Sequence, residues 1–280
     1  MISTSGPTEL LIKNPHSILS ALQHRPQDVL EVTLPRDKGR EEGPAGQDHV
    51  WKVIEQLARR ENVKVKEAAS SAIDGAREIK TQSKRDPRKK EVQPRKEFIG
   101  RESTHGAMIR PKKSLAIEEL FQEIDANTRG VWLALDCLQD PQNLGAIFRS
   151  AAFFGVKGLI MTSERSAPMT QTVYDISAGG VETLPFVTVI NLQRAFEVAK
   201  KSGMWILGTS EHAKDTLQNT KNDRPWLIVV GNEEKGMRRL TAEACDVVVS
   251  VPARPGPNGK IGVSSLNVSV ATGVILSHFS

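Results

Sequence analysis

The second half of the chain alternates short apolar runs with stretches of helical periodicity, and this alternation constrains the fold more than any other feature. The runs are nearly continuous and rich in β-branched residues, which is typical of strands buried on both faces of a parallel sheet. We therefore predict an α/β fold whose mostly parallel sheet carries helices on both faces. Ligands of such sheets bind beyond the carboxyl ends of the strands, so a site is expected in the loops there. Six runs carry the prediction: 131–135, 158–161, 186–190, 204–207, 226–230 and 247–251.

The sequence of the first half predicts a smaller α/β unit with its own strands and helices. Helical periodicity follows a capping signal at Asn14, and it recurs over 50–61 and 67–79. Short strands are expected at 10–12, 29–34, 63–65 and 105–110. The domain organisation that follows has four parts: a disordered N-terminus at 1–9, a small α/β domain at 10–111, a linker helix at 112–128 and a second domain at 129–280.

The net charge of +5 is modest, and the positive excess lies in the first 129 residues. Most of it comes from a basic insertion at 77–103, a proline-punctuated run that includes Lys89 and Lys90. A charged run without apolar periodicity is typical of a solvated linker or a disordered insertion. A contact with nucleic acid is the alternative, because Lys and Arg that neutralise phosphates supply affinity. Both interpretations can hold at once.

Targeting and redox features favour a cytoplasmic protein. No apolar run approaches the roughly 20 residues of a membrane span, and the N-terminus lacks the positive and apolar regions of a secretory signal. Cys137 and Cys245 stand in apolar, strand-like contexts without metal-type spacing. We therefore expect two buried thiols in a reducing compartment.

The last stretch of the chain predicts a final helix with an unusual first turn. Leu266, Val270 and Val274 recur at helical spacing, so we expect this row to dock into a core, with Ile275 and Phe279 widening it. Small polar residues stand among the apolar ones where the helix begins, at Ser265, Asn267 and Ser269. They fit either a simple N-cap or a site that uses the unpaired backbone N–H groups of a helix start.

Three strand-end loops carry the candidate chemistry. The loop 136–151 places Asn143 at a helix N-terminus and Arg149 further along the same helix, where its guanidinium fits either a phosphate or a structural carboxylate. The loop 231–237 has glycines on both sides of a polar turn, which either let backbone approach a ligand or make an ordinary tight turn. The third loop, 252–263, leads into the final helix. The glycine signatures of dinucleotide and phosphate-loop folds are absent.

Together these loops resemble the three motifs of the SpoU (TrmH) family of RNA ribose 2′-O-methyltransferases. The segments that carry the resemblance are Asn143 to Arg149, 231–237 and 265–271, and it extends over about 131–280. It implies that the C-terminal segment is threaded into a trefoil knot of the SPOUT type. More loosely, segments of the first half look like the small RNA-binding domain of the bacterial 23S rRNA guanosine 2′-O-methyltransferase branch.

The resemblance also implies a reaction, transfer of a methyl group from S-adenosylmethionine to a ribose 2′-hydroxyl without a metal ion, by a homodimer that binds RNA, most often rRNA. It implies that the knot loops bind the methyl donor through Gly231, Val251 and Leu266, with Thr209 as a weaker candidate. Two roles are open for Arg149: the first is to clamp the phosphate beside the target ribose and stabilise the forming alkoxide, and the second is to abstract the hydroxyl proton. The residues that would orient Arg149 and the nucleotide are Asn143, Glu233, Ser265 and Asn267.

Several alternatives stay open at this level. A related enzyme that acts on tRNA shares the three motifs, and a non-catalytic RNA-binding or ribosome-assembly factor could use the same scaffold. The loop 252–263 is longer than the family pattern and carries two cations, Arg254 and Lys260. We expect these cations to reach RNA phosphate beside the site, or the loop to be a flexible surface insertion.

Overall fold

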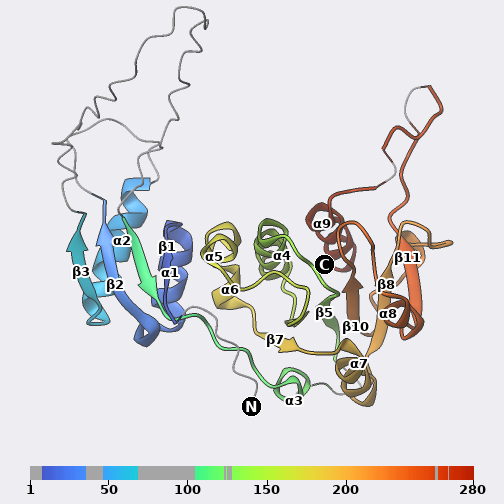
Figure 1. Ribbon diagram of the computed structural model, residues 1–280, viewed down its shortest axis with the longest axis horizontal. Coiled ribbons are helices and arrows are strands. Elements are labelled where there is room, and N and C mark those ends of the chain that lie inside the picture. Colours follow the sequence, from blue (N-terminus) through green and yellow to red (C-terminus); the bar gives the residue numbers. More distant parts are fainter. Residues whose placement is uncertain are drawn as a thin grey trace, which may run out of the picture.

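The computed structural model shows two β-sheets that lie side by side, each with its own helices (Figure 1). Several expectations fall outside the described residues: the N-terminus at 1–7, the basic insertion with Lys89 and Lys90, and all but the first two residues of the helix predicted at 67–79. The structure describes residues 8–35, 47–68, 105–122, 124, 128–255, 258–263 and 265–280, without the side chains of residues 47 and 48.

The N-terminal sheet has four strands in the order β1-β4-β2-β3. The central strands β2 and β4 are antiparallel, as are β1 and β4, while β3 joins the edge of β2 in parallel. Asn14 caps the first helix as predicted, since its side chain accepts a hydrogen bond from the N–H of His16 at 2.9 Å. The elements are β1 (Leu10–Ile12), α1 (Pro15–His24), β2 (Val29–Leu34), α2 (Gln47–Arg60), β3 (Lys64–Glu67) and β4 (Gly106–Ile109).

The C-terminal sheet has seven strands in the order β7-β6-β5-β10-β8-β11-β9, and every neighbouring pair is parallel. All six predicted strands are present, which confirms the parallel sheet. The two-residue strand β9 was not predicted. The strands are β5 (Gly130–Leu135), β6 (Gly158–Thr162), β7 (Phe186–Val189), β8 (Trp205–Thr209), β9 (Asp215–Thr216), β10 (Pro225–Val230) and β11 (Val247–Ser250).

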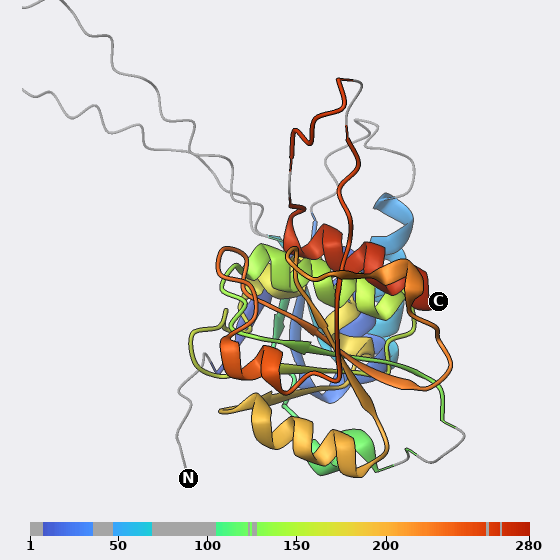
Figure 2. The same ribbon diagram turned by 90° about the vertical axis from the view of Figure 1, so that its right-hand side faces the viewer.

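Helices cover both faces of this sheet, as the continuous apolar runs predict (Figure 2). Side chains alternate along each strand, so that in β5 Leu133 joins one buried cluster and Trp132 the other. The helices α4, α5, α6 and α9 pack on the first face, and α3 and α7 on the second. Their bounds are α3 (Ile117–Phe121), α4 (Pro141–Phe153), α5 (Gln171–Ser177), α6 (Gly180–Thr183), α7 (Leu192–Lys201), α8 (Arg239–Glu243) and α9 (Val268–Phe279).

The final helix is present, and the prediction of its buried face is confirmed at Ile275 and Phe279 but wrong for the row Leu266, Val270 and Val274. Leu266, Val270 and Val274 are 50%, 52% and 41% exposed. The buried positions of α9 are Thr272, Ile275, Leu276 and Phe279. The helix is apolar on more than one side, so helical spacing alone could not tell which row meets the core. The linker helix, predicted over 113–127, is also shorter than expected: within the described residues, α3 has five residues.

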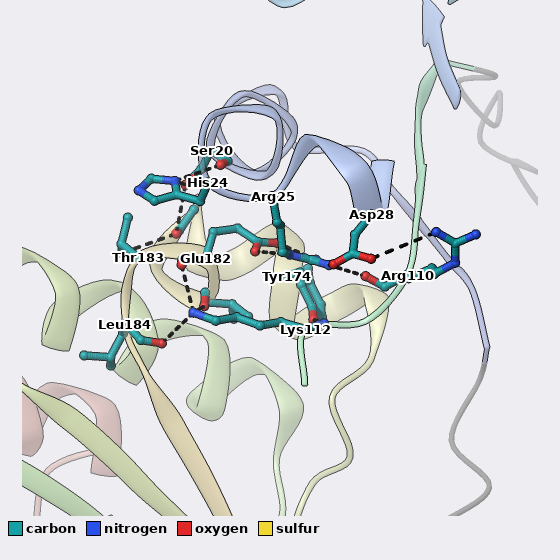
Figure 3. Close-up of polar contacts among 12 residues, drawn as sticks. Ser20, His24, Arg25, Asp28, Arg110, Lys112, Tyr174, Glu182, Thr183 and Leu184 are labelled. Carbon is teal, nitrogen blue, oxygen red and sulfur yellow. Dashed lines mark hydrogen bonds and ion pairs between the residues drawn. The ribbon is translucent and has the colours of Figure 1, made fainter. Parts of the chain in front are cut away.

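A buried polar network joins the two sheets through α1 and α6 (Figure 3). The Arg25 guanidinium, 6% exposed, donates from Nε and Nη2 to the two carboxylate oxygens of Glu182 at 2.5 and 2.9 Å. Its Nη1 donates to the carbonyl oxygen of Arg110, which follows β4. Although burial opposes the charge, the Glu182 carboxylate raises the pKa of Arg25 above its usual value. The pair therefore fastens the N-terminal sheet to the C-terminal one.

Further contacts extend this junction. The Lys112 ammonium donates to three carbonyl oxygens at the end of α6, those of Val181, Glu182 and Leu184. Burial lowers the pKa of Lys112, with Glu182 opposing the shift. The buried apolar residues of the N-terminal sheet also belong to the same cluster as the first face of the C-terminal sheet. The junction is thus both polar and apolar.

The expectation of two buried thiols is confirmed for one of the two cysteines. Both cysteines are free, but only Cys137 is buried, and Cys245 is half-buried. Burial, with a contribution from Asp246, raises the pKa of the Cys245 thiol to about 12. Within the described ranges, no helix has the length and apolar character that crossing a membrane requires.

Candidate functional site

A cavity of about 890 Å³ opens at the carboxyl ends of β8, β10 and β11. This volume lies in the range of small-molecule sites. Four chain segments form its walls: the loop after β8, the loop after β10, the loop after β11, and the start of α9. Parallel strands end at the same edge, so the sheet brings together loops that are far apart in the sequence.

The turn after β10 closes tightly on itself at one wall of this cavity. Asn232 and Gly236 exchange two backbone hydrogen bonds of 3.0 Å, and the Asn232 side chain accepts from the N–H groups of Glu234 and Lys235. A Cβ atom on Gly231 would lie 2.2 Å from backbone atoms of Gly236 and of Met237. Only glycine fits at Gly231, so the closed turn depends on it.

Side chains from all three predicted motifs meet in one hydrogen-bonded chain beside the cavity. The Asn143 amide, 8% exposed on α4, donates to Glu233 Oε1 at 3.3 Å. Its Oδ1 accepts from Asn267 Nδ2 at 3.0 Å. Glu233 itself lines the cavity and accepts from the backbone N–H groups of Gln139 and Asp140. The sequence placed these residues at one sheet edge, and the structure brings them into contact.

The Glu233 carboxylate is held in its charged form. Burial opposes ionisation, but hydrogen bonds from its own backbone N–H, from those of Asp140 and Gln139, and from the Asn143 amide outweigh it and lower the pKa of Glu233 below the usual 4.5. A fixed carboxylate at the cavity rim can orient donors but is a weak base.

Asn267 has a second role at the start of α9. Its Oδ1 accepts from the N–H of Ser269 at 2.9 Å and of Val270 at 3.4 Å, which is an N-cap. The N-cap interpretation is therefore confirmed, and the site interpretation stays a prediction. Ser265 is exposed and lines the cavity just before the helix begins.

Within the ranges that the structure describes, Arg149 lacks the structural carboxylate that one of its two sequence interpretations predicted. It is exposed on α4. No described residue forms an ion pair with it, so the structural carboxylate of the alternative interpretation is absent from the described part of the chain. It does not line the cavity. The guanidinium is thus available to an anion that approaches from solution.

The residues predicted to bind the methyl donor lie together. Thr209, Gly231, Val251 and Leu266 all line the cavity, as does Arg254. Lys260 is exposed on the same loop as Arg254 but does not line the cavity. Among the residues that the structure describes, no group of three or more His, Cys, Asp or Glu side chains is placed to hold a metal ion.

One supporting pair was not foreseen from the sequence. Asp136 is fully buried at the end of β5 and accepts from both the backbone N–H and the guanidinium of Arg238, at 2.9 and 2.7 Å. This pair anchors the loop after β10 to the end of β5. An aspartate directly after an apolar strand was the available signal, but nothing in the sequence pointed to its partner.

Known proteins are similar in sequence to the part of the chain that forms this site. A model of the SpoU rRNA Methylase family matches residues 130–277. A 23S rRNA (guanosine-2′-O-)-methyltransferase RlmB from Nitrosomonas europaea is 44% identical over 51% of this chain, which spans about half of that relative's length, 53%. The protein of the same name from Vibrio cholerae serotype O1 is 32% identical over 95% of this chain and 94% of its own.

Solved structures share the fold. The SpoU methyltransferase AviRb from Streptomyces viridochromogenes has a TM-score of 0.69, at 18% identity over 97% of this chain and 88% of its own. An rRNA methyltransferase from Sinorhizobium meliloti, solved with AdoMet bound, has a TM-score of 0.66, at 17% identity over 97% and 87% of the two chains. At this level of identity the likeness concerns the fold.

Proposed function

Because the chain belongs to the SpoU rRNA methylase family, we propose that it transfers a methyl group from S-adenosylmethionine to a ribose 2′-hydroxyl of large-subunit rRNA, with a guanosine as the target nucleoside. The observation that carries the proposal is the meeting of three strand-end segments at one cavity, with Glu233, Asn143 and Asn267 hydrogen-bonded beside it.

The cavity suits the methyl donor. Gly231 lines its wall, and the turn after β10 closes there only because position 231 has no Cβ atom. Thr209, Val251 and Leu266 supply the remaining contacts of the proposed donor site. Bound there, S-adenosylmethionine supplies an electrophilic methyl group, and the protein's tasks are to align the 2′-hydroxyl and to help it lose its proton.

Arg149 is the residue to which we assign catalysis. A guanidinium has a pKa above about 12, so it is a poor base. Its exposure and its lack of an ion-pair partner among the described residues leave it available to the phosphate next to the target ribose. Clamping that phosphate and stabilising the forming alkoxide is the role we assign to it.

The polar chain beside the cavity orients the reacting groups. Glu233, Asn143 and Asn267 hold one another through hydrogen bonds, and Ser265 lies at the cavity wall. Groups fixed in this way lose little freedom when the substrate binds, which favours in-line transfer. We assign all four a positioning role.

The N-terminal unit at 10–111 would recognise the RNA, with 112–128 as the linker and 129–280 as the transferase domain. The Arg25–Glu182 junction holds the two units in a fixed relation. Arg254 and Lys260 are exposed on the loop after β11 and would add phosphate contacts beside the site. Lys89 and Lys90, which lie outside the described residues, would add RNA contacts through the basic insertion.

Three further features complete the proposal. A trefoil knot is supported by the way the connection from β11 to α9 lines the same cavity as the loop after β10. A homodimer is supported by the exposed apolar row Leu266, Val270 and Val274, which is unusual for a helix face that meets only water. A cytoplasmic location is supported by two free cysteines.

The test is methyl transfer from labelled donor to protein-free large-subunit rRNA, with total tRNA in a parallel reaction. We expect label in rRNA, and we expect Arg149→Ala to abolish transfer while donor affinity stays within about twofold, a change of less than about 0.5 kcal/mol. Label in tRNA alone would favour the related tRNA enzymes. If the donor fails to stabilise the protein, where about 2.7 kcal/mol is expected at a hundred times its dissociation constant, a non-catalytic RNA-binding factor would be the better description.

A further inference from the structure

A second cavity, of about 370 Å³, lies on the other side of the turn after β10. Residues 232 and 234–237 line both cavities, so this turn is the shared wall between them. The remaining walls come from the loop after β5 and from Arg165 in the loop after β6. The proposed reaction does not use this second cavity.

The lining of the second cavity is positively charged. Four cations and two carboxylates contribute to it, the cations being Arg165, Lys235, Arg238 and Arg239. Arg238 is paired with Asp136, and Arg239 with Glu243 outside the cavity. The other two cations, Arg165 and Lys235, have no ion-pair partner among the side chains of the described ranges. Two carboxylates belong to this lining, and the one on Asp136 is paired with Arg238. The Glu234 carboxylate is therefore the one that can offset the charges of Arg165 and Lys235.

The backbone that carries Arg165 is fixed in place. Its φ angle is +56°, and that of Cys137 across the cavity is +61°, both in a region that side chains other than glycine seldom adopt. The N–H of Ala167 donates to the carbonyl oxygen of Leu138 at 2.7 Å, and the N–H of Cys137 donates to Thr162 Oγ1 at 3.1 Å. Non-glycine residues in this conformation cluster at functional sites, and two of them line this cavity.

The position of the cavity indicates what the cations bind. Gln139 lines it, and the N–H of Gln139 donates to Glu233, so the cavity adjoins the polar chain of the proposed site. An RNA strand whose ribose lies beside Glu233 has a phosphate on each side of that ribose. A guanidinium and an ammonium are the groups that bind such phosphates.

We propose that Arg165 and Lys235 form a phosphate subsite for the RNA strand in the second cavity, where Lys235 belongs to the turn 232–237 that lies between this cavity and the donor cavity. The subsite rests on the proposed function, because it takes the phosphate of a nucleotide neighbouring the target. It binds backbone phosphate and carries no information about base identity.

The test compares the full-length wild type with R165A/K235A in filter binding of protein-free large-subunit rRNA over a series of KCl concentrations. We expect the double variant to bind about tenfold more weakly at low salt and to lose about one unit of the slope of log affinity against log salt. R165K/K235R keeps both charges and should retain most of the affinity. The matched control is R194A/K201A, which removes two exposed cations from α7, a helix that lines neither cavity.

Two comparisons decide whether the two cations bind RNA phosphate or the methyl donor. Donor affinity should be the same in R165A and wild type, because Arg165 lines only the second cavity. A fall in donor affinity without a fall in RNA affinity in R165A and R165A/K235A would assign the cations to the donor's carboxylate and overturn the subsite. RNA affinity and salt slope equal to those of the R194A/K201A control would also overturn it. If wild type binds the RNA but transfers no methyl group, the proposed function fails while the binding comparison still decides the subsite.

Discussion

At the scale of single residues, the turn after β10 depends on the absence of one side chain. A Cβ atom at Gly231 would lie 2.2 Å from the backbone of Gly236 and Met237, far inside contact distance. We therefore expect Gly231→Ala to force the turn open and to weaken binding of S-adenosylmethionine at least tenfold, about 1.4 kcal/mol. Isothermal titration calorimetry of the full chain measures this directly.

The control for this prediction is a glycine without neighbours. A Cβ atom on Gly262 would meet nothing within 4 Å, and Gly262 does not line the cavity. Gly262→Ala should leave donor affinity unchanged. Equal donor affinity in Gly231→Ala and Gly262→Ala would mean that the turn does not form the wall of the donor site.

Sequence patterns placed the candidate site residues at one sheet edge but did not give their contacts. Asn143, Glu233 and Asn267 stand at the ends of predicted strands or the start of a predicted helix, and a parallel sheet brings such positions together. The sequence could not show that Arg149 is exposed, because apolar neighbours along a helix point to other faces. Nor could it pair Asp136 with Arg238, since no spacing rule links two loops that are 102 residues apart.

At the scale of secondary-structure elements, α9 presents an apolar row to solvent. If this row is the contact between two copies, a charge in its middle should separate them. We expect Val270→Asp to convert a dimer to a monomer in size-exclusion chromatography with light scattering. The fold should survive, because Val270 is 52% exposed and an aspartate in the first turn of a helix suits the helix dipole.

Ile190→Asp is the matched control, since Ile190 is also an exposed apolar residue, at 60%, but lies after β7 and away from α9. It should leave the oligomeric state as in wild type. A Val270→Asp protein with the same mass in solution as Ile190→Asp would rule out α9 as the dimer contact.

The same helix shows what element prediction from sequence can and cannot do. Continuous β-branched runs identified six strands of the large sheet, because burial on both faces leaves no polar alternation. The row Leu266, Val270 and Val274, which begins just before α9, satisfies helical spacing as well as the positions that are buried. Periodicity identifies an apolar row, and only packing decides whether the core or another molecule covers it.

At the scale of the whole molecule, the two sheets are held together by residues that no sequence pattern connects. Arg25 and Glu182 are 157 residues apart and lie in different helical or turn segments. Their pairing depends on the packing of α1 against α6, which no sequence pattern predicts (Figure 3). The division into an N-terminal and a C-terminal half was predictable from the change of pattern, but the interface between them was not.

Removing Arg25 tests how much this junction contributes. Arg25→Ala leaves the Glu182 carboxylate, 3% exposed, without the guanidinium that binds both its oxygens. Breaking a buried pair from one side costs about 3–5 kcal/mol, because the remaining charge stays desolvated. We expect a loss of that size in the free energy of unfolding, measured by urea denaturation.

Two variants make this result specific to the buried charge. Arg25→Ala combined with Glu182→Ala removes the stranded carboxylate, so the double variant should recover part of the stability that Arg25→Ala loses. Arg59→Ala breaks the exposed pair with Glu55, whose side chains are 68% and 36% exposed, and should cost no more than about 1 kcal/mol. A loss in Arg25→Ala no larger than in Arg59→Ala would mean that the apolar contacts of α1, rather than the ion pair, hold the two sheets together.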